Sequence, residues 1–145
     1  MADVVASAEA FSSTDALREI WKLTAEVAVG TALVNGTRAG VAYTPSGGHL
    51  AAPKTVGPVT VSGFPDGGVG LDALEASVAT DGTYEFPVTG ADATTANGTA
   101  VYAVVASGRI TGLTLTSSGN TLFGVINNPK DYVGAAGAIC VKIGV

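Results

Sequence analysis

Short segments of alternating apolar and polar residues, separated by turns rich in glycine, make up the chain from residue 26 onward. In residues 83–88, Tyr84, Phe86 and Val88 occupy every second position, which is typical of a strand with one buried face. Roughly eight or nine such strands at short, even spacing predict an all-β fold, a small β-barrel or sandwich of antiparallel strands. The segments expected to form strands are residues 27–34, 38–43, 59–61, 74–79, 83–88, 100–106, 109–115, 121–126 and 138–145.

Residues 1–26 differ from the rest because their apolar positions have helical spacing. Leu17, Ile20 and Trp21 stand at i, i+3 and i+4, which predicts a short amphipathic helix. A helix of about two turns does not persist alone in water, so its apolar face must dock. We expect an N-terminal arm over residues 1–26 and a β-barrel-like domain over residues 27–145. The helix would pack either against this chain's own barrel or against a neighbouring subunit.

Two loops rich in glycine and proline are the next candidates for contact with a partner. Residues 44–58 form a loop that is long for a compact domain, and such loops often carry function. Residues 62–72 form a second loop, with an aromatic residue at its tip. The residues expected to contact a partner in these loops are His49, Leu50, Lys54 and Phe64.

Charged residues are scarce, at 13% of the chain, against about a quarter in an ordinary soluble protein. Residues 93–129 contain a single charged side chain, that of Arg109. A surface so poor in charge is normally covered, and we interpret the cover as other protein subunits. The net charge of −5 and the scattered basic residues argue against a nucleic-acid partner.

Side chains capable of catalysis or metal binding are few. The chain has one histidine, His49, and one cysteine, Cys140, so the sequence predicts no metal site and no cofactor. Ser46, His49 and Asp66 could be drawn as a catalytic triad, but Ser46 lacks the strand–turn–helix context of a nucleophile. Cys140 alternates with apolar residues and is expected to be a small strand residue. We therefore expect a protein that is not an enzyme; a small hydrolase would depend on His49 alone.

The beginning of the chain does not resemble a targeting signal. Residues 1–10 lack the basic and apolar regions of a secretory signal, and no run approaches the ~20 apolar residues of a membrane helix. A single cysteine excludes an intrachain disulfide framework. We expect a soluble protein, made inside the cell, with no membrane partner.

The order of segments between residues 27 and 145 resembles the small decoration, or cement, proteins of tailed-phage capsids. The pieces that carry the resemblance are, in order, AVGTALVNGTRAGVAYT, LEASVATDGTYEFPV, GTAVYAVVASGRIT, GNTLFGVINNP and AAGAICVKIGV. The resemblance implies a β-barrel-like domain that assembles as a homotrimer on the outside of the capsid. It also implies that the protein is made in the host cytoplasm and holds adjacent major capsid protein subunits together in the virion.

A second class of function stays open beside this one. A receptor- or carbohydrate-binding β module of a virion usually exposes clustered aromatic residues beside acidic or amide side chains. Residues 64–66 and 127–132 come nearest to that pattern. Under the capsid hypothesis, Leu17, Ile20 and Trp21 are the first candidates for reaching a neighbour, and the two loops are the second.

Overall fold

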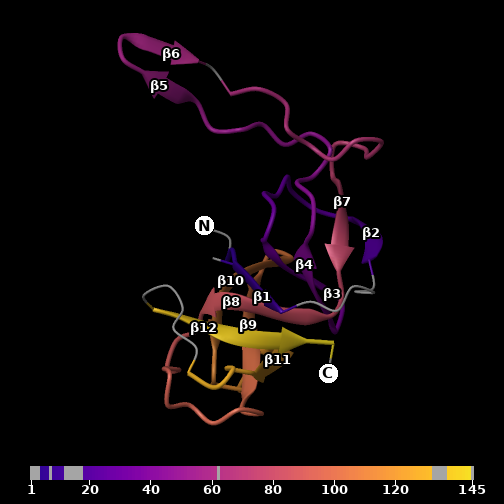
Figure 1. Ribbon diagram of the computed structural model, residues 1–145. Helices are drawn as coiled ribbons and strands as arrows, with labels where there is room; N and C mark the ends of the chain where they lie inside the picture. Colours follow the sequence, from indigo (N-terminus) through magenta and orange to yellow (C-terminus); the bar gives the residue numbers. More distant parts are fainter. Residues whose placement is uncertain (1–3, 7, 12–17, 62, 132–136, 145) are drawn as a thin grey trace.

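The computed structural model describes residues 4–6, 8–11, 18–61, 63–131 and 137–144, and within them the protein is all-β, as predicted. The described residues contain twelve strands and no helix (Figure 1). No helix in these ranges is therefore long and apolar enough to cross a membrane. Three of the strands, two near the N-terminus and one within the first predicted loop, were not expected from the sequence.

Six strands form a curled antiparallel sheet, ordered β1-β8-β12-β11-β9-β10. Its strands are β1 (Ala8–Phe11), β8 (Gly82–Pro87), β12 (Ala138–Ile143), β11 (Thr121–Ile126), β9 (Ala100–Ala106) and β10 (Arg109–Thr114). Irregularities in the pairing interrupt the ladder in β1, β10 and β11. Such bulges increase the local twist, which fits the curl of this sheet.

A second antiparallel sheet has four strands in the order β2-β7-β4-β3, and a third consists of β5 and β6 alone. The four-stranded sheet contains β2 (Arg18–Lys22), β7 (Glu75–Ala79), β4 (Arg38–Ala42) and β3 (Ala32–Asn35), and the small sheet contains β5 (Lys54–Val56) and β6 (Val59–Val61). Strands β3 and β4 are joined by a tight turn at Gly36 and Thr37, because Asn35 pairs with Arg38 at the end of this hairpin.

One hydrophobic core joins the two larger sheets. Phe86 lies at its centre with no exposed surface, and its ring meets Phe123 edge-on at 5.6 Å between ring centroids. Val41 and Ala79 of the four-stranded sheet belong to the same cluster as Phe86. Strand β3 lies against β10, and β4 lies against β11, so the two sheets pack face to face around these side chains.

The helix predicted for the N-terminal segment is wrong where the structure describes it. Arg18–Lys22 form strand β2, which pairs with β7, and Leu17 lies outside the described residues. Ile20 and Trp21 consequently face opposite sides of the sheet, with 63% and 4% of their surface exposed. Pairing with β7 ties this segment to the body of the protein, whereas a helix of about two turns would be marginally stable on its own in water.

Trp21 packs in a second, smaller core on the four-stranded sheet, together with Val78. Gly40 leaves the space for its ring. A Cβ atom at Gly40 would lie 2.4 Å from Cγ1 of Val78 and 2.8 Å from Cη2 of Trp21. The two alternatives for docking were this chain's own barrel and a neighbouring subunit. Trp21 packs within its own chain.

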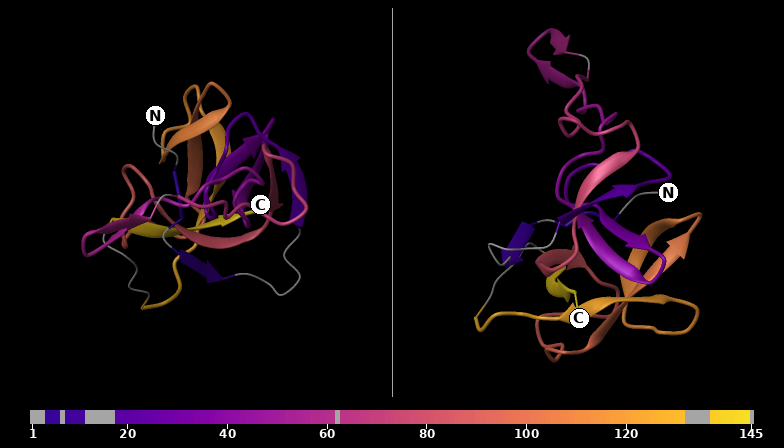
Figure 2. Two further views of the ribbon diagram at one scale, coloured as in Figure 1. Left: turned by 90° about the horizontal axis from the view of Figure 1, so that it is seen from above. Right: turned by 90° about the vertical axis from the view of Figure 1, so that its right-hand side faces the viewer.

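The chain between β4 and β7 leaves the body of the protein and carries β5 and β6 at its far end (Figure 1; Figure 2). The right-hand view in Figure 2 shows this segment extending well beyond both larger sheets. It contains both of the loops predicted to contact a partner.

Candidate functional site: the projecting hairpin

The two predicted loops are the two sides of one structure. The backbone N–H of Ala51 donates to the carbonyl of Phe64 at 2.8 Å, and Leu50 forms a β-bridge with Pro65. The N–H of Asp66 donates to the carbonyl of His49 at 3.2 Å. We call residues 49–66 the projecting hairpin; residue 62 lies outside the described residues.

The expectation that residues 44–58 are a loop throughout is wrong at Lys54–Val56, which form strand β5. This strand pairs with β6 across a two-residue turn at Gly57 and Pro58, with Val56 directly opposite Val59. Gly57 has a φ of +57°, a conformation that a residue with a side chain rarely adopts. The turn therefore depends on glycine.

The tip of the projecting hairpin has two different faces. Lys54 pairs with Val61 and Val56 with Val59, so these four side chains share one side, which we call the valine face. Val56, Val59 and Val61 are 71%, 58% and 52% exposed. The opposite side carries Thr55 and Thr60, whose hydroxyl oxygens lie 3.2 Å apart. The tip is thus apolar on one face and polar on the other.

Nothing in the described part of this chain covers the hairpin. All six residues of β5 and β6 are exposed, and Leu50 and Phe64 are 57% and 58% exposed. A two-stranded hairpin on its own is marginally stable in water. Contiguous exposed apolar side chains on a projecting element mark a surface for contact with another molecule.

The base of the hairpin is held to the body by a neck of closely packed backbone. A Cβ atom at Gly67 would lie 2.1 Å from the carbonyl oxygen of Gly47, and one at Gly47 would lie 2.3 Å from the carbonyl oxygens of Leu71 and Asp72. The N–H of Gly47 donates to the carbonyl of Glu75 at 2.9 Å. Only glycine fits at these two positions. The two glycines therefore allow the backbones on the two sides of the neck to lie in contact.

The three side chains that could be drawn as a triad are not arranged as one. Nδ1 of His49 lies 2.5 Å from Oδ1 of Asp66, across the base of the hairpin. Ser46 is fully buried, and its hydroxyl accepts a hydrogen bond from the N–H of Val27 at 2.9 Å and donates to the carbonyl of Val27. The hydroxyl of Ser46 thereby joins the neck to the body.

Cys140 is fully buried in strand β12. Burial raises the pKa of its thiol to about 11, and the nearby carboxylate of Glu85 adds to this effect. The thiol is therefore protonated at neutral pH, in agreement with the prediction of a small strand residue. Among the described residues, no group of three or more His, Cys, Asp or Glu side chains could hold a metal ion.

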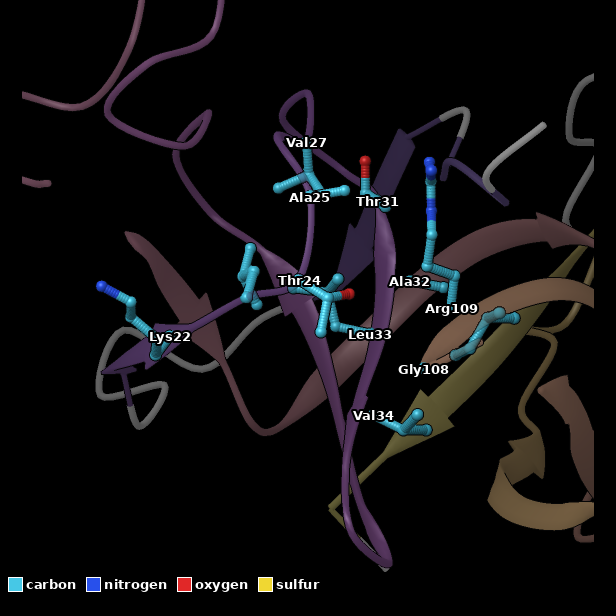
Figure 3. Close-up of a pocket in the computed structure, with 12 residues that line it drawn as sticks. Lys22, Thr24, Ala25, Val27, Thr31, Ala32, Leu33, Val34, Gly108 and Arg109 are labelled. Atoms are coloured by element: carbon cyan, nitrogen blue, oxygen red, sulfur yellow. The ribbon is translucent and has the colours of Figure 1, made fainter. Parts of the chain in front are cut away.

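Two of the hollows in the described part of the body differ greatly in size. The smaller, of about 70 Å³, lies between the four-stranded sheet and the start of β10, where Thr31, Leu33 and Arg109 line it (Figure 3). A space of that size holds a few water molecules at most. The larger, of about 740 Å³, lies where β7 runs into β8, and we call it the distal hollow. It is lined by Thr37, Arg38, Ala39, Thr80, Asp81, Asn120, Thr121, Leu122, Phe123 and Gly144.

The structure brings together four of the seven residues predicted to contact a partner. His49, Leu50, Lys54 and Phe64 all lie on the projecting hairpin, whereas Ile20 is exposed on the edge strand β2. Sequence reasoning missed the pairing of the two loops and the distal hollow. The pairing had a signal, since apolar residues flank the Gly57–Pro58 turn at matched distances. The hollow had none, because its lining comes from segments far apart in the sequence.

Comparison of the chain with protein-family models, with curated proteins and with solved structures finds no match.

Proposed function

We propose that this protein is a structural, non-enzymatic decoration protein of a phage capsid. It binds the outer surface of the head as a homotrimer and stabilises contacts between major capsid protein subunits. The virion surface is then its final location, and it binds neither nucleic acid nor membrane. The observation that carries the proposal is the projecting hairpin, whose apolar face is not covered by any described residue of the chain.

Two further features support an assembling role over a catalytic one. The single histidine is paired with Asp66 at the base of the hairpin, and the hydroxyl of Ser46 is buried against Val27. Residues 93–129, with Arg109 as their only charged side chain, supply β9, β10 and β11 at one end of the six-stranded sheet. A surface so weakly charged is suited to contact with other protein subunits.

A trimer suits this role for a thermodynamic reason. Three copies held together present three contacts to the capsid at once, and linked contacts give a high avidity without any single strong site. The acidic balance of the chain, −5 overall, discourages misplaced binding to DNA.

The proposal is tested by sedimenting purified phage heads with the protein and measuring the bound fraction. We expect saturable binding to intact heads, a mass of three chains in solution by light scattering, and heads that resist heating better when decorated. A protein that stays in the supernatant at micromolar concentration would contradict the proposal. Binding to a glycan array in place of heads would favour the receptor-binding alternative.

A further inference from the structure

We propose that the tip of the projecting hairpin of one copy occupies the distal hollow of a second copy, where Lys54 pairs with Asp81. The inference rests on the proposed homotrimer and names the two surfaces that join its subunits. It commits to a second copy of this chain as the partner of the valine face.

The distal hollow contains an unsatisfied acidic group. Oδ1 of Asp81 is buried and has no hydrogen-bond partner among the described residues. Leu122, on the same hollow, leaves 47% of its surface exposed at the start of β11. A carboxylate oxygen without a partner is costly, and a cation brought in from outside would relieve that cost. The hollow thus offers an acidic group beside an apolar one.

The other charged side chain that lines the hollow is already paired. Arg38 lies 2.7 Å from Oε2 of Glu19, which also accepts a hydrogen bond from Nε1 of Trp21 at 2.9 Å. The bond from Trp21, followed by that from Arg38, holds the pKa of Glu19 below its ordinary value. Glu19 is therefore ionised at neutral pH and pairs with Arg38, so that Asp81 is the acidic side chain of the hollow that has no ion pair within the described residues.

The hairpin tip matches this hollow in charge and in polarity. Between residues 50 and 65, Lys54 is the only charged residue, and it shares the valine face with Val56, Val59 and Val61. One cation beside three apolar side chains is the complement of one carboxylate beside Leu122. Burial of the valine face against Leu122 would remove from water apolar surface that the described part of the chain leaves exposed.

The tip and the hollow of one chain lie too far apart to meet each other. Strand β4 begins at Arg38, which lines the hollow, and ends at Ala42, just before the segment that carries the hairpin. Strand β7 begins where that segment returns and runs away from it to Ala79, two residues before Asp81 (Figure 1). Five residues of strand span about 17 Å, and the hairpin extends further in the opposite direction. Contact between tip and hollow must therefore join two copies.

A contact between two different surfaces of identical copies has a consequence for symmetry. Such head-to-tail contacts form closed rings when the rotation between copies closes, and a rotation of one third of a turn gives a trimer. Each subunit then both inserts a hairpin and receives one, so no valine face and no hollow is left uncovered.

Charge reversal tests the pairing of Lys54 with Asp81. We expect Lys54→Glu and Asp81→Lys each to raise the dissociation constant of the trimer about tenfold or more in sedimentation velocity, and the double variant to recover most of the loss. Lys130→Glu, a change at another exposed lysine, is the matched control and should leave the trimer intact. Trimers of wild-type affinity in both single variants would overturn the inference.

A cross-linking experiment tests the contact between the hairpin tip and the distal hollow even if the Asp81→Lys variant does not fold. Oxidising a chain with both Val59→Cys and Leu122→Cys should produce covalent trimers on a non-reducing gel, because a disulfide needs Cα atoms within about 7 Å. Each single variant should give dimers at most. Intact trimers without cross-links would reject this interface and leave the proposed function standing. A protein that is monomeric and fails to bind heads would reject both.

Discussion

Removing the tip of the projecting hairpin should weaken assembly but leave the stability of the fold almost unchanged. In the variant, an Asn–Gly turn replaces residues 52–63, so that the hydrogen bond from Ala51 to Phe64 closes a shorter hairpin. The six residues of β5 and β6 are all exposed and pair only with each other, so their loss removes no core contact. Shortening the connection between β4 and β7 by about ten residues lowers its closure entropy cost by about 0.3 kcal/mol. The free energy of unfolding should therefore change by less than about 1 kcal/mol.

The same deletion should weaken association strongly. Three valines that are 52–71% exposed would each contribute about 1 kcal/mol on burial, or about 3 kcal/mol for every contact between copies. That corresponds to a dissociation constant about 100-fold higher for each contact.

Urea denaturation of the isolated chain and sedimentation velocity over a range of concentrations measure the two effects separately. A variant that still forms trimers of wild-type affinity, or one that loses several kcal/mol of unfolding free energy, would refute this reasoning.

Four further predictions concern the body of the protein. Gly40→Ala should lower the free energy of unfolding by about 1–3 kcal/mol in urea titrations, because the added methyl group meets Val78 and the ring of Trp21. Trp21→Ala should cost about 3–5 kcal/mol by the same measurement, whereas Ile20→Ser, at an exposed position, should cost less than about 1 kcal/mol; equal losses would contradict the placement of Trp21 in the core. Cys140 should resist thiol reagents at pH 8 until the protein unfolds, and rapid labelling of the native protein would disprove its burial. Because the pKa of this thiol is raised by folding, its contribution to stability is complete below its ordinary value of 9.0 and is lost as the pH rises through about 11, which denaturation at graded alkaline pH would detect.

The strands from β7 onward could be predicted from the sequence because each is a short segment of β-type residues bounded by turn residues. Residues 121–126 were expected as a strand and form β11 with the same bounds, between a turn that contains Gly119 and the Asn127–Asn128 pair. Local pattern was sufficient there because turn residues on both sides bound a short segment of apolar and β-branched residues.

Strand β2 shows where local pattern is insufficient. Leu17, Ile20 and Trp21 have helical spacing, yet Arg18–Lys22 pair along their whole length with β7, more than fifty residues away. Only the tertiary partner decides between the two interpretations, and a single segment of five residues carries no information about it.

For a related reason, the sequence predicted the contact residues of the candidate site but not their arrangement in space. The residue types of the hairpin, exposed Leu50, Lys54 and Phe64 among glycine and proline, could be recognised as contact residues. That they share one element depends on pairing between residues 49–51 and 64–66, which follows from the turn at Gly57. The distal hollow depends on the packing of β4, β7 and β11, and it is visible only in three dimensions.

The neck has a consequence for how subunits meet. Since the backbones at Gly47 and Gly67 lie too close for any side chain, and since the N–H groups of Gly47 and Gly48 are bonded to Glu75 and Ala73, the direction of the hairpin is set before a neighbour arrives. An extension whose angle is already set gives up little conformational freedom when it is captured. The angle between successive subunits of an assembly is then set by the structure of each single subunit. Adding one methyl group at the neck would change this angle, and with it the curvature of the assembly.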